Sequence, residues 1–309
     1  MKKIEVIVPL LNEFEVIEEL LLEINNLFDD FKNDNVDLGL VLVDDGSDEE
    51  FKKLLKNYKK KYDFKLIELS RNYGQQTAFK AGIQQTNADA VILMDGDLQD
   101  PPSLIPEMIE AYISGFEIVN TIRNKREKES WFKKFSASLF YKLVDNNSNI
   151  NLTRNSGDFK LISTNLIEII KSTKENDIYL RGLVDWYGGK VLYLDYDRQP
   201  RFAGKRKYKY RQSFDLALNG LVSFSDFFPN ILLKLFIGFL IIFFGITIFL
   251  FSSIISSYDN LVRGWSSIVA TLLFISIIQI FGFFFMAIYL NKIFHQTSGK
   301  NNYQISNIS

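Results

Sequence analysis

The amino-acid sequence predicts an α/β domain with a mostly parallel sheet and helices on both of its faces, followed by amphipathic helices beside a membrane and two transmembrane helices. Short apolar runs rich in β-branched residues alternate with helix-length amphipathic segments over roughly the first 120 residues. Polar clusters follow four of these runs, and the C-terminal third holds two long stretches without a charged residue. These observations favour a globular domain joined to a membrane anchor.

The alternation of strand and helix defines the expected order of elements. Parallel strands covered on both faces read as continuous apolar runs, and ligands bind at the carboxyl ends of such strands. The expected strands are IEVIVPL (4–10), LGLVLVD (38–44), FKLIEL (64–69), ADAVILMD (88–95) and FEIVNT (116–121), with helices over 15–31, 49–62, 75–85 and 103–113.

Composition excludes several kinds of chemistry. The chain of 309 residues has no cysteine, so disulfides, thiolate metal sites and cysteine nucleophiles are excluded. Its single histidine, His295, lies near the C-terminus, which excludes a histidine general base in the main domain. The formal net charge of -1 gives no overall attraction to nucleic acid, and we expect no nucleic-acid partner.

The two uncharged stretches, about 235–255 and 265–290, each exceed the roughly 20 residues that a helix needs to cross a bilayer core. Two buried core helices are the alternative, but a helix that is apolar all round requires a larger core than this chain can build. The connection SSYDNLVRG is short and nearly neutral, whereas Lys234, Lys292 and Lys300 lie on the other side. The positive-inside rule therefore predicts a multi-pass protein of the plasma membrane with a cytoplasmic catalytic domain.

These observations give four expected regions. Residues 1–211 form the cytoplasmic catalytic domain, 212–231 a juxtamembrane amphipathic helix, 232–293 the two transmembrane helices, and 294–309 a cytoplasmic tail. Two amphipathic segments have apolar residues at helical spacing, which suits either a protein core or a membrane surface. They are 129–144 and 213–228, and the latter lies within the expected juxtamembrane helix.

A dense basic run precedes the amphipathic segment 213–228. Clustered cations beside a membrane helix typically attract anionic lipid headgroups. The embedded Gly204 indicates, in addition, a loop shaped around a ligand. The run comprises Arg198, Arg201, Lys205, Arg206, Lys207, Lys209 and Arg211.

The stretch MDGDLQDPP follows the fourth expected strand. Asp95 and Asp97 are one residue apart, so both can turn towards one cation, while Gly96 lets the backbone approach closely. Such oxygen ligands, with Gln99 as a neutral addition, suit Mg²⁺ or Mn²⁺ shared with substrate phosphates. Asp100 followed by proline is typical of a helix N-cap. A calcium loop is excluded, because the residues at 100 and 106 are not the glycine and glutamate that it needs.

The stretch VDDGSD follows the second expected strand. It is either a plain turn or a pair of aspartates, Asp44 and Asp45, that grips a ribose or a base edge, with Gly46 and Ser47 shaping the loop. The chain has no glycine-rich dinucleotide fingerprint and no P-loop, so neither of these sites is supported.

Seven motifs, in their order and approximate spacing, resemble the family 2 glycosyltransferases that load a sugar onto a polyprenyl phosphate, such as dolichol-phosphate mannose synthase and bacterial undecaprenyl-phosphate glycosyltransferases. The resemblance covers essentially the whole chain, including two C-terminal membrane helices. The motifs are VPLLNE, VDDGSD, RNYGQQTAFKAG, LMDGDLQDPP, SGDFKLIS, LRGLVDWYGG and RFAGKRKY.

The resemblance implies a GT-A-like, Rossmann-like fold and a set of site residues. The nucleotide-sugar pocket would comprise Pro9, Asn12, Glu13, Asp44, Asp45, Ser47, Arg71, Asp95 and Gly96. The metal ligands would be Asp95, Asp97 and Gln99, holding Mg²⁺ or Mn²⁺ on the diphosphate. The lipid phosphate would meet Arg123, Arg201 and Lys207, and the catalytic group would comprise Asp97, Asp158, Arg123 and Arg201.

Three departures from the family pattern put sugar and base specificity in doubt: Leu11, Asn155, and the pair Lys205 and Arg206. We expect UDP-glucose as the donor first, and GDP-mannose or another UDP-sugar as the alternatives. The expected acceptor is undecaprenyl phosphate. An ionised lipid phosphate can attack the sugar without a strong protein base, and a single displacement inverts the anomeric centre.

Two rival functions remain. A processive polysaccharide synthase of the same family would carry a Q-x-x-R-W motif, whereas the nearest pattern here, Arg263 to Trp265, lies between the membrane stretches. A membrane-anchored nucleotide-sugar sensor or scaffold would tolerate loss of the metal ligands, which are present. Small residues in the apolar stretches and the amphipathic segments leave homo-oligomerisation open.

Overall fold

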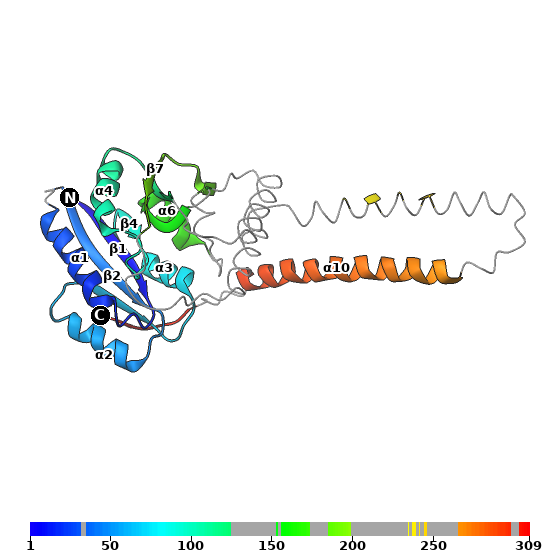
Figure 1. The fold of residues 1–309 in the computed structure, drawn as a ribbon, viewed down its shortest axis with the longest axis horizontal. Coiled ribbons are helices and arrows are strands. Elements are labelled where there is room, and N and C mark those ends of the chain that lie inside the picture. Colours follow the sequence, from blue (N-terminus) through cyan, green and yellow to red (C-terminus); the bar gives the residue numbers. More distant parts are fainter. Residues whose placement is uncertain are drawn as a thin grey trace, which may run out of the picture.

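The computed structural model describes residues 1–31, 35–124, 153, 156–173, 185–198, 265–297 and 303–309, together with 234, 237, 238, 241, 244 and 245. In these ranges the chain forms one eight-stranded sheet with helices on both faces (Figure 1). The strands are β1 (Lys2–Leu10), β2 (Val36–Asp44), β3 (Lys65–Leu69), β4 (Ala90–Leu93), β5 (Ile118–Arg123), β6 (Ser156–Ser163), β7 (Val191–Tyr196) and β8 (Ile305–Ile308). The helices are α1 (Ile17–Asp30), α2 (Glu49–Tyr58), α3 (Gln75–Gln84), the 3-10 turn η1 (Pro102–Leu104), α4 (Ile105–Ile113), α6 (Thr164–Ser172) and α10 (Trp265–Thr297).

The strand order is β7-β5-β6-β4-β1-β2-β3-β8. Strands β1 to β4 are mutually parallel, β5 and β7 are parallel to each other, β6 runs antiparallel to β4 and β5, and β8 runs antiparallel to β3. The predicted mostly parallel sheet with helices on both faces is confirmed, and all five predicted strands are present. Strands β6, β7 and β8 were not predicted.

Two apolar cores lie on opposite faces of the sheet. Along β1, Val6 and Val8 point to the face covered by α1, α2 and α4, whereas Ile7 points to the face covered by α3 and α6. This alternation follows from the period of two in a strand, and burial of both faces explains why the predicted strands are apolar throughout. One side-chain cap and one proline help to define the helix starts. The Asp48 side chain accepts the Phe51 N–H at 2.9 Å at the start of α2, and a proline stands in the first turn of α4.

Helix α10 extends away from the sheet (Figure 1) and contains the predicted membrane stretch 265–290. Several of its described apolar side chains are exposed, among them Phe283 and Leu290. Within the part of the chain that the structure describes, no helix combines the length and the hydropathy that a membrane span requires. The stretch 235–255 lies mostly outside the described residues, as do the amphipathic segments 129–144 and 213–228.

Candidate active site

Four loops meet at the carboxyl ends of β1 to β4. They are loop 1 (11–16), loop 2 (45–48), loop 3 (70–74) and loop 4 (94–101). Two glycines permit their contact. Gly46 has a φ of +73°, and a Cβ there would lie 2.2 Å from the backbone carbon of Arg71 in loop 3. A Cβ on Gly96 would lie 2.7 Å from Leu10 and 3.0 Å from the carbonyl of Pro9. Larger residues would therefore push the loops apart.

Hydrogen bonds join loops 1 and 2. The Asn12 N–H donates to Ser47 Oγ at 2.9 Å, and the Asp48 N–H donates to Asn12 Oδ1 at 3.0 Å. The Ser47 N–H in turn donates to Asp44 Oδ1 at 3.1 Å. Asn12 adopts a positive φ of 50°, a conformation that asparagine tolerates better than most residues. The structure thus brings together three residues predicted for the nucleotide pocket.

The two neighbouring aspartates of loop 2 have different surroundings. Both carboxylate oxygens of Asp45 accept from loop 3, one from the Tyr73 N–H at 2.7 Å and one from the Gly74 N–H at 2.9 Å. Burial raises the pKa of Asp45 to about 6, against the effect of these two hydrogen bonds. Asp44 is fully buried, and its Oδ2 has no hydrogen-bond partner among the described residues. One oxygen of Asp44 is therefore unsatisfied by the described residues, whereas both oxygens of Asp45 hold loop 3.

Pro9, Glu13 and Arg71 border this pocket. Pro9 lies on β1 opposite Val43, and the carbonyl of Glu13 accepts the N–H groups that begin α1. The guanidinium carbon of Arg71 lies 4.4 Å from the ring centre of Tyr73. Their roles in nucleotide binding remain predictions.

Loop 4 and the end of β7 form a cluster of charged side chains. An Nη2 atom of Arg198 lies 3.6 Å from an oxygen of Asp95 and 4.0 Å from an oxygen of Asp97, and its Nε lies 3.8 Å from Asp100. The Gln75 side-chain amide donates to Asp95, and the Gln99 N–H donates to Asp97 Oδ1 at 3.2 Å. The two aspartates predicted to bind a metal thus converge on one cationic group.

A second set of contacts holds Arg123 beside this cluster. Its Nη2 lies 3.5 Å from Asp100, and its Nε donates to the Tyr196 hydroxyl at 2.9 Å. The same hydroxyl donates to Asp100 Oδ1. Asp100 does not cap a helix as expected, because η1 begins after Pro101 and α4 after Leu104. Its carboxylate faces Arg123 and Tyr196 instead, so the N-cap interpretation was wrong.

Burial dominates the electrostatics of this cluster. It raises the pKa of Asp95 well above the ordinary value, and the charges of Asp100, Asp158 and Asp97 raise it further, against Arg123. Burial also raises the pKa of Asp100, which Arg123 opposes most strongly. The site therefore concentrates negative charge around Asp95 that a bound cation would relieve.

The remaining predicted residues fall into two groups. Asp158 is buried on β6, and its charge raises the pKa of Asp95. Four residues of the basic run lie outside the described residues, as does Asn155. They are Arg201, Lys205, Arg206 and Lys207.

Sequence reasoning missed four residues of the site. Gln75 was visible in the RNYGQ cluster, and Arg198 stood in the basic run, but neither had been given a contact with Asp95. Nothing in the sequence pointed to Tyr196. Gly157 was hidden in the SGDF motif, where a Cβ would lie 2.6 Å from Arg123 Nη2.

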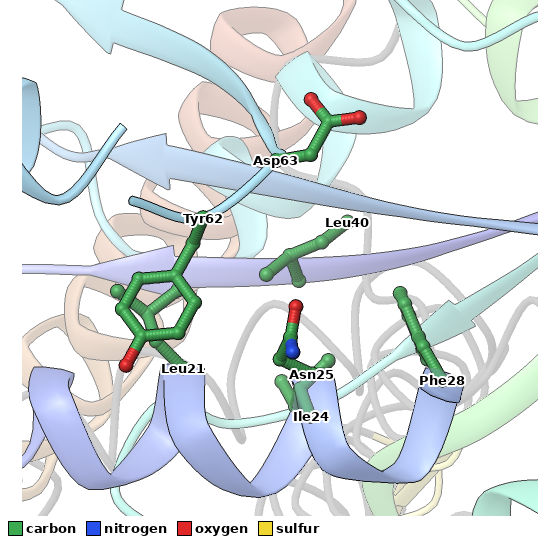
Figure 2. A pocket seen from close by; sticks show the side chains of 7 residues that line it. All are labelled: Leu21, Ile24, Asn25, Phe28, Leu40, Tyr62 and Asp63. Carbon is green, nitrogen blue, oxygen red and sulfur yellow. The ribbon is translucent and has the colours of Figure 1, made fainter. Parts of the chain in front are cut away.

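One hollow lies away from this edge of the sheet. Figure 2 shows that α1 forms one of its walls, with Leu40 of β2 and the segment before β3 opposite. Its lining is mostly apolar and offers one carboxylate, so we assign it no part in the site. The lining residues are Leu21, Ile24, Asn25, Phe28, Leu40, Tyr62 and Asp63.

The arrangement suits a divalent cation bound with a phosphate ligand. The described residues contain no group of three or more His, Cys, Asp or Glu side chains placed to hold a metal. Mg²⁺ and Mn²⁺ are often held by one or two carboxylates, with substrate phosphates and water completing the shell. Asp95 and Asp97 provide two such carboxylates, which already face a single cationic group.

Comparison with known proteins identifies the family. Residues 5–170 match the domain described as glycosyl transferase family 2, and the chain belongs to this family. It is a glycosyltransferase.

Curated relatives align with almost the whole chain. A prophage bactoprenol glucosyl transferase homolog of Escherichia coli K12 is 32% identical over 311 residues, which cover 99% of each chain. The bactoprenol glucosyl transferase of Shigella phage SfX is 31% identical over 307 residues and 98% of each chain. Among solved structures, glucosyl-3-phosphoglycerate synthase of Mycobacterium tuberculosis with Mn²⁺, UDP and phosphoglyceric acid is 18% identical, with a TM-score of 0.49 over 73% of this chain and 80% of that one.

Proposed function

We propose that this glycosyltransferase transfers a hexose from a nucleoside diphosphate sugar to a polyprenyl phosphate, with inversion at the anomeric carbon and with the help of Mg²⁺ or Mn²⁺. The observation that carries the proposal is the convergence of Asp95 and Asp97 on one cationic group beside Arg123, at the carboxyl edge of the sheet. Such an edge is where α/β sheets bind nucleotides.

The donor would lie across loops 1, 2 and 4. Asp44 Oδ2 is a buried acceptor without a hydrogen-bond partner among the described residues, which suits a donor group of the ribose or the base. Asn12 and Ser47 hold loops 1 and 2 around it. The diphosphate would then reach the Asp95 and Asp97 carboxylates. We take UDP-glucose as the first donor to test, because the relatives are named glucosyl transferases, with GDP-mannose and other UDP-sugars next.

The metal would be held by Asp95 and Asp97, with Gln99 near them. A divalent cation at this position supplies charge neutralisation for the departing nucleoside diphosphate. Arg198 occupies the same side of both carboxylates, so it would have to share or yield this position. Arg123 is fixed by Tyr196 and Asp100, and it adds a positive charge that needs no rearrangement.

The acceptor follows from the relatives, which are named for bactoprenol. A phosphate monoester has a second pKa of about 6, so one of its oxygens is an ionised nucleophile at neutral pH. That oxygen forms a bond to the anomeric carbon, while the bond from this carbon to the diphosphate oxygen breaks and its electron pair leaves with the nucleoside diphosphate. Because no proton has to be removed, the reaction needs no histidine base, and the protein supplies orientation and charge.

Acceptor contacts would come from three cations and one acid. Arg123 would orient the lipid phosphate together with Arg201 and Lys207 of the basic loop. Asp158, buried on β6 near Asp95, would face the acceptor side. A lipid acceptor also requires the active site to lie at a membrane surface. The apolar stretches 235–255 and 265–290 would anchor the enzyme there as a multi-pass protein of the plasma membrane, with the catalytic domain in the cytoplasm.

The test is transfer of radiolabel from a panel of nucleotide sugars to undecaprenyl phosphate by the purified full-length protein in detergent. We expect an organic-extractable product from one donor, formed with Mg²⁺ or Mn²⁺ and lost when a chelator is added. If nucleotide sugars bind but no donor yields a lipid-linked product, the result would contradict the proposed acceptor.

A further inference from the structure

The C-terminal residues return to the catalytic domain and extend its sheet. Strand β8 pairs antiparallel with β3, with Ile308 opposite Ile67 and Asn307 opposite Glu68. The Leu66 N–H donates to the Ser309 carbonyl at 2.8 Å, and the Ser309 N–H donates back at 2.9 Å. Figure 1 shows the C-terminus lying against the α/β domain, although α10 extends away from it. The chain's own end thus covers the edge of β3, which would otherwise expose unpaired backbone groups.

Side chains fix the register of this strand. Asn307 Nδ2 donates to Glu68 Oε2 at 2.6 Å, and Ser306 Oγ donates to the Glu68 carbonyl at 2.9 Å. Tyr303 is 8% exposed and packs into the apolar core on the α3 side of the sheet, where its hydroxyl bonds to Gln84. Tyr303 therefore anchors the segment from within the core.

Next to Tyr303, at the start of the segment, Gln304 holds loop 3. The Ser70 N–H donates to the Gln304 carbonyl at 2.9 Å. The Tyr73 hydroxyl lies 2.9 Å from Ser70 Oγ, so the residue that Gln304 holds also contacts the Tyr73 side chain. The Gln304 backbone thus holds the first residue of loop 3.

Loop 3 in turn holds loop 2. The Tyr73 and Gly74 N–H groups are the two donors to Asp45, and the backbone of Arg71 lies directly against Gly46. A continuous series of contacts therefore leads from Tyr303 and Gln304 to the segment that carries Asp44 and Ser47.

We propose that Tyr303 and strand β8 are positioning elements for the nucleotide-sugar site, because they hold loop 3 and, through it, loop 2 in the binding conformation. This inference rests on the proposed function, since it takes the ligand of loop 2 to be a nucleoside diphosphate. The chemistry at Asp95 and Asp97 lies in loop 4, whereas the contacts given above for residues 303–309 are with β3, Gln84 and loop 3. Loss of the anchor should therefore weaken nucleotide binding more than it slows turnover. If the binding-competent fraction of loop 2 falls to about a tenth, the apparent affinity falls about tenfold.

The experiment compares Tyr303→Ala with Ile308→Ala in the full-length protein. Both changes shorten a large side chain of the same segment, but Ile308 is 45% exposed and lies opposite Ile67, within β3. The probe is UDP, titrated at equilibrium with Mn²⁺, followed by kcat and KM with UDP-glucose and hydrogen exchange of residues 70–74. For Tyr303→Ala we expect about tenfold weaker UDP binding, a KM raised by a similar factor, a kcat within about twofold, and faster exchange of loop 3. Ile308→Ala should match the wild type.

Two results would overturn the inference. One is wild-type UDP affinity and loop 3 exchange in Tyr303→Ala and in a chain that stops at residue 302. The other is a loss of kcat with unchanged KM. If the wild type itself does not bind UDP or GDP, the proposed function fails. Hydrogen exchange then still decides whether β8 holds loop 3, so the two failures are distinguishable.

Discussion

The position of Arg123 depends on the absence of a side chain at Gly157, and Gly157→Ala tests this directly. A Cβ at this position would lie 2.6 Å from Arg123 Nη2, 3.0 Å from Cζ and 3.1 Å from Nε. Because an ordinary contact is about 3.5 Å, the guanidinium would have to retreat by about 1 Å. Its hydrogen bond to the Tyr196 hydroxyl, now 2.9 Å, would then exceed the normal range.

The expected effect on stability is small. Arg123 keeps its charge, and the end of a flexible side chain can move. Lengthening the separation from Asp100 from 3.5 Å to about 4.5 Å weakens the attraction by about 1 kcal/mol at an effective dielectric constant of about 20. The effect on catalysis is expected to be larger, since a 1 Å displacement of a positioning group can cost about 100-fold in rate, or about 2.7 kcal/mol of barrier.

The assay is kcat for sugar transfer alongside the unfolding free energy. For Gly157→Ala we expect kcat to fall about 100-fold, with a loss of about 1 kcal/mol in stability. Gly39→Ala is the control, because it also adds a methyl group to a strand, 3.3 Å from Glu5 Cγ and away from the site. Unchanged kcat in folded Gly157→Ala would refute the reasoning that Arg123 must stay where it lies.

Three further predictions concern Asp45, Tyr196 and Arg198. Because burial raises the pKa of Asp45 from 3.8 to about 6, its contribution to stability is present below about pH 4 and lost as the pH rises through about 6. As the pH falls from 6 to 4, the unfolding free energy of the wild type should therefore rise by about 2 kcal/mol relative to that of Asp45→Asn. Parallel curves for the two proteins would contradict the assignment. Tyr196→Phe removes the hydroxyl shared by Arg123 and Asp100 and should lower the free energy of unfolding in urea by about 1–3 kcal/mol. Tyr193 is exposed on the same strand, so Tyr193→Phe should lower it by less than about 0.5 kcal/mol. Arg198→Gln removes a cation that faces Asp95 and Asp97, so Mn²⁺ should bind several-fold more tightly in the absence of nucleotide. Electron paramagnetic resonance measures this binding. Equal or weaker binding would show that Arg198 does not compete with the metal ion.

The first half of the fold was predictable because its signals are local. Each parallel strand is a continuous apolar run, and each is followed by polar residues that the shared strand direction brings to one edge. Asp44, Ser47, Asp95 and Asp97 could be placed in this way. Strand β4 ends at Leu93, earlier than predicted, because Met94 and Asp95 already belong to the loop that carries the acidic residues.

The rest depends on pairings that no local pattern records. Tyr196 and Arg198 reach Asp100 only because β7 pairs with β5, whose end carries Arg123. Asp100 itself stands before two prolines, which is typical of a helix cap, but its tertiary partners decided its role. Strand β8 is four residues long and polar in part, and its position follows from Tyr303 and Glu68 rather than from periodicity.

The most direct test of the account compares the wild type with Asp97→Asn. Asparagine keeps the size of the side chain but removes the charge that would hold the cation and, with it, the diphosphate. With UDP-glucose, undecaprenyl phosphate and Mn²⁺, we expect the wild type to form the lipid-linked sugar and Asp97→Asn to form about 1,000-fold less, while both proteins melt at the same temperature. Equal product formation by the two proteins would contradict the assignment of Asp95 and Asp97 as the centre of the transfer site.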